Sequence, residues 1–330
     1  MGERVIRHIE PTPLSATPTE TPLFDLQNDR HRQVLQLLEQ GTEALLTSEG
    51  YQAYLQTMSR FHRYSFANSL LIHAQKPEAT RVAGYRTWQS LGRQVCKGET
   101  AIKIFVPFKK KLEHPDPGEE DERVTGFGVG NVFDISSTEG EPLPERPPLT
   151  ESTEASAVSR EVNKRLSRFL IDEGLLLEST PLHGNAHGVW NPARRQIVIR
   201  RAVSVDEETG EEIPLVDPLN IQKTKTLAHE AAHFLAGHAG DIDRRDAEVV
   251  AESSAFVALE RFGLRTDNYT FGYVASWAGD MARVRANLAD VQHIASTLIT
   301  AIEGAADSTG AAESGEAQWS GSEPPDLGKS

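Results

Sequence analysis

Residues 224–238, TKTLAHEAAHFLAGH, contain the strongest chemical pattern of the chain, the pentad His229-Glu230-Ala231-Ala232-His233. On a helix, two residues four positions apart lie on one face, so both imidazoles can reach one metal ion. The glutamate between them can polarise a metal-bound water as general base. We therefore predict that His229 and His233 bind Zn²⁺, that Glu230 is catalytic, and that the helix spans about 221–237.

A catalytic zinc site usually has three protein ligands and one open position. The next expected helix, at about 245–262, carries Glu248 and Glu252, which are four apart and share a face. As in gluzincins, we assign Glu248 as the third ligand and Glu252 as the acid that braces a ligand histidine. The reversed assignment of these two glutamates stays open.

Other residues could complete such a site. His238 lies five residues beyond His233, but the extended metzincin spacing would require glycine at 236 and histidine at 239, where the chain has alanine at both. We therefore expect His238 to be exposed at the helix end. A side chain that stabilises the oxyanion is also expected in a peptidase, and Tyr269, Tyr273 and His293 are available without any pattern that selects one.

The stretch 224–238 followed by AEVVAESSAF at 247–256 resembles the C-terminal zincin-like domain of ArdC-type antirestriction proteins. It is more distantly similar to the ImmA/IrrE metallopeptidases. The resemblance implies a metallopeptidase-like fold with a protein substrate. It also implies that a hairpin at 187–200 flanks the cleft, with an edge strand that can hold an extended peptide.

A second signal lies in the charge distribution. The formal net charge is −14, but residues 51–111 carry eleven Lys and Arg against two acidic residues, which is +9 and leaves −23 for the rest. The same segment holds nine of the 22 aromatic residues. Cations follow the phosphates of single-stranded nucleic acid, and flat rings stack on unpaired bases. A solvated basic face over an ordinary aromatic core is an equally open interpretation.

Within this segment, residues 67–107 (ANSLLIHAQKPEATRVAGYRTWQSLGRQVCKGETAIKIFVP) and 127–137 (FGVGNVFDISS) resemble the N-terminal single-stranded-DNA-binding domain of ArdC proteins. The resemblance implies single-stranded DNA as a partner, and double-stranded DNA stays open. A structural role is the alternative for each candidate contact, above all for Trp88 and Asn68. The candidate DNA-binding residues are Arg63, Asn68, Arg81, Trp88, Arg93, Lys97 and Lys103.

Composition breaks divide the chain. Residues 1–24 and 304–330 are polar and rich in Pro, Gly and Ser, so we expect them to be disordered. Residues 136–156, with four prolines, read as a linker. The ordered blocks are then a DNA-binding domain at 25–135 and a zincin-like domain at 157–303, both of the α+β class.

The spacing of apolar residues predicts the main elements of both blocks. In the first block, these are helices at 26–46, 65–75 with Ser65 as N-cap, and 87–91, and strands at 101–108 and 126–134. In the second, they are a helix at 157–173, a hairpin of 189–190 and 196–200, and helices at 221–237, 245–262 and 281–302.

Composition also restricts the cellular setting. The single cysteine, Cys96, excludes a disulfide framework and a cysteine-built metal site. No stretch has the roughly 18–20 consecutive apolar residues of a membrane span, and the first residues lack the apolar core of a signal peptide. We expect a cytoplasmic protein with no membrane partner.

Three functions are compatible with these patterns. The first is a DNA-binding antirestriction-type protein with a zinc metallopeptidase-like domain. The second is a regulatory protease that cleaves a DNA-bound repressor, as the ImmA/IrrE similarity implies. The third is a non-catalytic, zinc-stabilised DNA-binding module.

Overall fold

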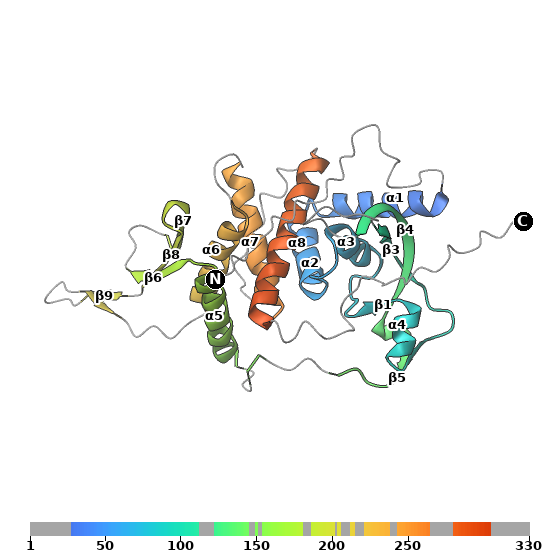
Figure 1. The fold of residues 1–330 in the computed structure, drawn as a ribbon, viewed down its shortest axis with the longest axis horizontal. Coiled ribbons are helices and arrows are strands. Elements are labelled where there is room, and N and C mark those ends of the chain that lie inside the picture. The colour runs from blue at the N-terminus through green and yellow to red at the C-terminus, as the bar shows by residue number, and fades with distance from the viewer. Residues whose placement is uncertain are drawn as a thin grey trace, which may run out of the picture.

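The computed structural model describes residues 28–111, 122–144, 149–150, 154–180, 186–201, 203–205, 212–214, 221–237, 243–264 and 280–304. The fold is α+β, as predicted, with helices in the centre and small sheets on both sides (Figure 1). Residues 1–24 and nearly all of 304–330, for which we predicted disorder, lie outside the described residues. None of the helices described has both the length and the apolar character that crossing a membrane requires.

Three helices form the centre of the molecule: α6 (Ile221–Leu235), α7 (Arg244–Glu260) and α8 (Met281–Glu303). Their positions agree with the predicted helices to within about three residues. Helix α7 is buried along most of its length, because α6, α8 and a helix from the N-terminal part all pack against it. The central position of α7 explains why its sequence is rich in Ala, Ser and Val, whose small side chains allow close helix packing.

Helix α5 (Ala155–Asp172) and a three-stranded sheet lie on one side of this centre (Figure 1). The strand order is β6 (Leu176–Thr180), β8 (Gln196–Arg200), β7 (Gly188–Asn191). The predicted hairpin is confirmed as the antiparallel pair β7–β8. Strand β6, which pairs with β8 in parallel, was not predicted, because its side chains do not alternate between buried and exposed. A short pair, β9 (Val203–Val205) and β10 (Glu212–Pro214), follows.

On the other side lie α1 (Asp29–Ala44), α2 (Ser48–Arg60) and α3 (Phe66–Gln75). Ser65 caps α3 as predicted, since its hydroxyl accepts the backbone N–H of Asn68. The sequence prediction omitted α2. Its signal is the spacing of buried side chains at 51, 54, 55 and 58, which is the i, i+3, i+4, i+7 pattern of an amphipathic helix.

A long antiparallel ribbon of β3 (Ile102–Lys111) and β4 (Glu122–Asp134) covers α1 and α3, and β1 (Val82–Ala83) pairs with the far end of β4. Next to β1 lies the short helix α4 (Tyr85–Ser90). Strand β2 (Arg93–Val95) pairs with β5 (Thr138–Gly140), which falls inside the predicted linker 136–156.

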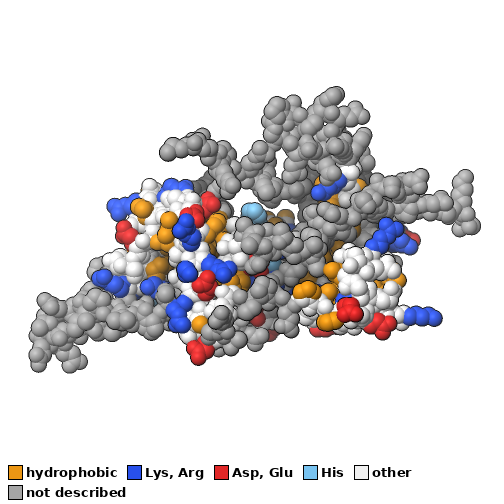
Figure 2. Space-filling model, turned by 60° about the horizontal axis from the view of Figure 1, so that its bottom comes forward, with side chains coloured by type: hydrophobic (Ala, Val, Ile, Leu, Met, Phe, Trp, Pro, Cys, Tyr) orange, Lys and Arg blue, Asp and Glu red, His pale blue; other side chains and the backbone are white. Residues whose placement is uncertain are grey.

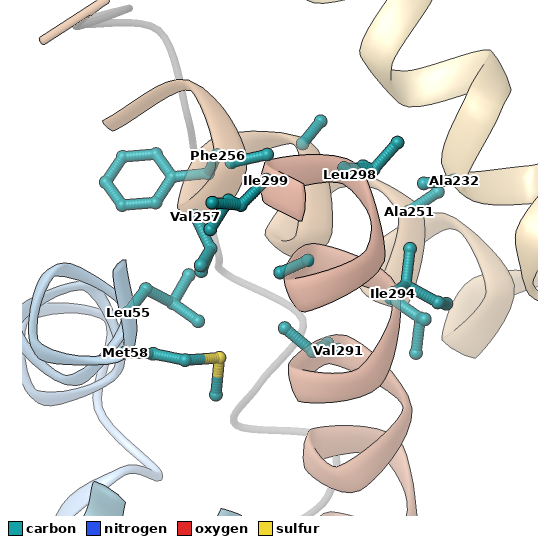
Figure 3. Close-up of a cluster of buried hydrophobic side chains, with 14 of the residues drawn as sticks. Leu55, Met58, Ala232, Ala251, Phe256, Val257, Val291, Ile294, Leu298 and Ile299 are labelled. Atoms are coloured by element: carbon teal, nitrogen blue, oxygen red, sulfur yellow. The ribbon is translucent and has the colours of Figure 1, made fainter. Parts of the chain in front are cut away.

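One hydrophobic cluster runs through both predicted blocks. Figure 3 shows Leu55 and Met58 pointing from α2 towards Val257 of α7 and Val291 of α8. The buried hydroxyl groups of Tyr51 on α2 and Ser253 on α7 are 2.9 Å apart and share a hydrogen bond. The two blocks therefore share a core, and the boundaries 25–135 and 157–303 stay a prediction.

Candidate functional site

A cleft of about 650 Å³ opens between α6, α7 and the edge strand β7. Helix α6 presents His229 and His233 on one face because they are one turn apart, and α7 presents Glu248 from its second turn. The polar residues lining the cleft are His187, Gln222, Lys225, Thr226, His229, Glu230, His233, Arg244, Glu248 and Glu252.

Three of the predicted residues lie together as a potential set of metal ligands. The two Nε2 atoms of His229 and His233 are 3.1 Å apart. Oε2 of Glu248 is 3.4 Å from Nε2 of His229 and 3.7 Å from Nε2 of His233. With zinc–ligand bonds of about 2.0–2.1 Å, the edges of a tetrahedron are roughly 3.3 Å. The spacing and chemistry of these donors therefore fit a divalent cation.

Glu252 lies on the other side of the His229 ring. Its Oε2 is 3.0 Å from Nδ1 of His229, and its Oε1 is 3.1 Å from Nζ of Lys225. Both oxygens are thus engaged away from the Nε2 atoms. Of the two glutamates that the sequence left open, Glu248 is the one that faces the histidine pair. Lys225, one turn before His229 on α6, was not among the predicted site residues.

Glu230 is buried at the floor of the cleft, where its carboxylate accepts the backbone N–H of Trp190 on β7. Burial raises the pKa of Glu230 above its ordinary value. The close approach of β7 requires glycine at 188, since a Cβ there would lie 2.6 Å from Cγ2 of Thr226 and 3.0 Å from Oε1 of Glu230. Strand β7 therefore fixes the position of Glu230 through the Trp190 N–H and the close approach of Gly188. No local sequence pattern predicts this tertiary contact.

Charge interactions around the histidines are strong. Burial lowers the pKa of His229, but its hydrogen bonds to Glu248 and Glu252 outweigh burial and raise the value to about 9. The hydrogen bonds from His229 and His233 hold the pKa of Glu248 well below its usual range. In the metal-free protein, His229 therefore keeps its proton at neutral pH, and a cation would have to displace that proton in order to bind.

The remaining predicted candidates for this site are placed as follows. His238, Tyr269 and Tyr273 lie outside the described residues. His293 is exposed on α8 and does not line the cleft. Within the described part of the cleft, Arg244 on the first turn of α7 is an exposed cation that the sequence analysis missed.

Several candidate DNA-binding residues have their polar groups bonded within the fold. The Asn68 side chain donates to Phe105 O at 2.9 Å and accepts from Phe105 N at 2.8 Å, which joins α3 to β3. Trp88 is buried, and its Nε1–H donates to Phe133 O. The Arg93 guanidinium donates to the side chain and backbone of Thr138. These three side chains thus have contacts that stabilise the fold, and their role as DNA contacts stays a prediction.

The other four candidates keep at least part of their charged groups accessible. Arg63 forms an ion pair with Glu303 at 3.6 Å. Arg81 is half-buried, Lys97 is exposed, and Lys103 donates to the side chain of Gln33 at the surface. Figure 2 shows Lys and Arg side chains on the side of the molecule that carries α4 and also on the opposite side, which carries α5.

The fold and the cleft together define a class of protein: an α+β chain in which an HExxH helix and a glutamate from the following helix form a candidate metal centre. Residues 24–133 match the family model described as the N-terminal domain of anti-restriction factor ArdC. Over these residues, the resemblance to ArdC-type antirestriction proteins is confirmed. The matched range nearly coincides with the block predicted at 25–135.

One solved structure shares the fold, and a second is reported beside it. The Mn(II)-bound crystal structure of antirestriction protein ArdC from plasmid R388 is 16% identical, with a TM-score of 0.50, over 81% of this chain and 98% of that chain. Its metal-free structure is 19% identical, with a TM-score of 0.48, over 80% and 97% of the two chains.

A curated relative is an uncharacterized protein of Bacillus anthracis, which is 25% identical over 288 residues. The alignment takes in 74% of this chain and 46% of the relative, so the chain spans about half the length of that protein.

Proposed function

We propose that this chain is a single-stranded-DNA-binding antirestriction-type protein whose HExxH cleft holds Zn²⁺ and acts as a metallopeptidase. The observation that carries the proposal is the convergence of His229, His233 and Glu248, whose donor atoms lie 3.1–3.7 Å apart. Glu230 is buried in the same cleft. The fold shared with ArdC supports the combination of both parts in one chain.

The donor set favours zinc among the divalent cations. Two imidazoles and one carboxylate are a common ligand set of catalytic zinc sites, which keep a fourth position open. The ArdC of plasmid R388 was crystallised with Mn(II), which supports a divalent cation in this type of protein. Glu248 is the proposed third ligand, and Glu252 the proposed orienting partner of His229.

The side chains of the cleft then have distinct chemical roles. A bound zinc ion would supply a Lewis acid that lowers the pKa of water and polarises a carbonyl group. Glu230 would accept the proton of the attacking water and pass it to the departing amine, a role for which its raised pKa is suited. Glu252 would hold the Nδ1–H of His229, so that Nε2 remains available as a ligand.

The proposed DNA contacts are the cations of the 51–111 segment that the fold leaves accessible. Lys97 and Lys103 are the leading positions, and Arg81 is a third. The net charge of +9 in this segment supports an attraction to phosphates that the average of −14 conceals.

The test measures zinc content and binding of a labelled single strand for the wild type, His229→Ala and Glu230→Gln. We expect the wild type to contain one zinc, His229→Ala to lose it, and Glu230→Gln to keep it but lose peptide cleavage. Strand binding should fall steeply as salt increases. Wild-type protein without zinc would overturn the proposed metal site. Absence of strand binding at low salt would overturn the proposed DNA binding. Equal cleavage by the wild type and Glu230→Gln would overturn the catalytic role of Glu230.

A further inference from the structure

The structure sorts the nine aromatic residues of the 51–111 segment by whether they can touch a ligand. Seven are at most 8% exposed and form part of the core. A base cannot stack on a ring that is already packed on both faces. The seven buried rings are Tyr51, Tyr54, Phe61, Tyr64, Phe66, Trp88 and Phe105.

The remaining two, Phe108 and Tyr85, are 49% and 44% exposed. Each of the two rings is followed in the chain by an exposed cation, Lys109 or Arg86. Exposed rings and exposed cations are the two features that surfaces binding single-stranded nucleic acid combine.

Phe108 lies on β3 where the register of the β3–β4 ribbon shifts, between Phe108 and Lys109. It pairs with Gly126, and the hydroxyl of Thr125 donates to its backbone oxygen. The edge of its ring rests on the backbone of Gly128, where a Cβ would lie 2.5 Å from Cζ of the phenylalanine. The edge of the ring therefore contacts a glycine, while about half of the residue, 49%, stays exposed.

Tyr85 begins α4, beside the opposite end of the same ribbon. Its hydroxyl forms a hydrogen bond with the side chain of Gln94, which orients the ring. The adjacent strand β1 pairs Ala83 with Phe133, seven residues along β4 from Gly126. At about 3.3 Å per residue, the two ends of this stretch are roughly 23 Å apart. The backbone of Lys103 lies between them, because it pairs with Asn131.

We propose that Phe108 and Tyr85 are the base-stacking positions of this protein, at the two ends of a single-strand path along the β3–β4 ribbon. The inference rests on the proposed DNA binding and specifies its ligand as unpaired bases in addition to phosphates. Charge selects this ligand over an apolar protein partner, since both rings lie in the basic segment of an otherwise acidic chain.

The test compares two labelled 20-nucleotide strands, oligothymidine and an abasic strand of the same length, by fluorescence polarisation at several salt concentrations. Phe108→Ala and Tyr85→Ala should each weaken oligothymidine binding by about 5- to 150-fold, the range of one stacked base, with the salt slope unchanged. Neither should weaken binding of the abasic strand. Phe108→Trp should keep wild-type affinity, because it preserves a flat ring.

Two controls separate stacking from folding. Phe108→Leu keeps an apolar cover over Gly128 but has no ring face, so it should behave as Phe108→Ala does. Leu176→Ala removes a 60% exposed side chain from the sheet β6–β8–β7 and should leave strand binding unchanged.

Wild-type affinity of Phe108→Ala or Tyr85→Ala for oligothymidine would overturn the assignment of that ring. An equal loss on the abasic strand would overturn stacking as its cause. If the wild type bound neither strand at low salt, the proposed DNA binding itself would be wrong, and the inference would fall with it.

Discussion

The Glu252 carboxylate lies behind the His229 imidazole, with Oε2 3.0 Å from Nδ1, while Nε2 on the far side of the ring faces Glu248 and His233. A hydrogen bond from Nδ1–H to Glu252 leaves the Nε2 lone pair directed at the proposed metal. This contact is one of several between side chains of α6 and α7, together with those of Glu252 with Lys225 and of Glu248 with the two histidines.

Glu252→Gln should weaken metal affinity by about 10- to 100-fold, because a neutral amide orients and polarises the ligand histidine less well. Competition with a chromophoric chelator measures the affinity. Glu139→Gln, an exposed acid on β5, is the matched control and should bind metal as the wild type does. Unchanged affinity in Glu252→Gln would show that the contact does not support the metal.

Glu248→Gln should weaken metal affinity more than Glu252→Gln does, by more than about 100-fold. The reason is that Glu248 is a proposed ligand, whereas Glu252 only orients one. Zinc content after dialysis and chelator competition give the order of the two variants. The opposite order would mean that the two glutamates exchange roles.

The stability of the metal-free protein should depend on the protonation of His229, whose pKa of about 9 exceeds the unfolded value of about 6.5. Because its pKa is higher in the folded state, protonated His229 stabilises the fold, and the contribution is complete at pH values below the unfolded pKa. This contribution is lost as the pH rises through about 9. Metal affinity should change in the opposite direction, rising with pH as the proton leaves.

Thermal unfolding of chelator-treated protein between pH 6.5 and 9.5 tests this dependence. His229→Gln should flatten the decline in stability, because it lacks the titrating ring. An equally steep decline in that variant would assign the effect to another group.

Tyr51→Phe should lower the free energy of unfolding by about 1–3 kcal/mol, because it leaves the buried hydroxyl of Ser253 without its partner. Ser253→Ala should have a similar effect, and the double variant should cost less than the sum of the two. Urea unfolding followed by circular dichroism provides the measurement. Strict additivity would indicate that the hydrogen bond does not couple α2 to α7.

Asn68→Ala and Lys97→Ala should separate folding from DNA contact. The asparagine variant should be destabilised by about 1–3 kcal/mol, because two backbone groups of Phe105 lose their partner, with no change in the salt slope of strand binding. The lysine variant should keep its stability and lose about 0.7 from that slope, the value of one phosphate contact. The reverse pattern would make Asn68 the phosphate contact and Lys97 the structural residue.

Much of this molecule follows from local spacing. The helical periodicity of 221–237, 245–262 and 281–302 predicted three helices that the structure confirms. The i, i+4 spacing of His229 and His233 placed both candidate ligands on one face of the first of these helices. The ArdC-like pattern combines Gly92, Lys97 and Gly98, which lie in turns, with Trp88, which is a buried residue of α4. Strand β6 was not predicted because its side chains do not alternate between buried and exposed. Helix α2 was not predicted either, although its buried side chains follow the i, i+3, i+4, i+7 spacing of a helix.

The sequence by itself thus determined the candidate metal ligands on α6 and the basic segment, since both depend on residue type and separation along the chain. Only the tertiary structure placed Glu248 with the histidine pair and Glu252 with Lys225, because the two glutamates share a face of α7 and differ only in what packs opposite them. It likewise decided that Trp88 is in the core and Phe108 at the surface. Burial depends on contacts between residues far apart in the chain, which the composition of a segment does not contain.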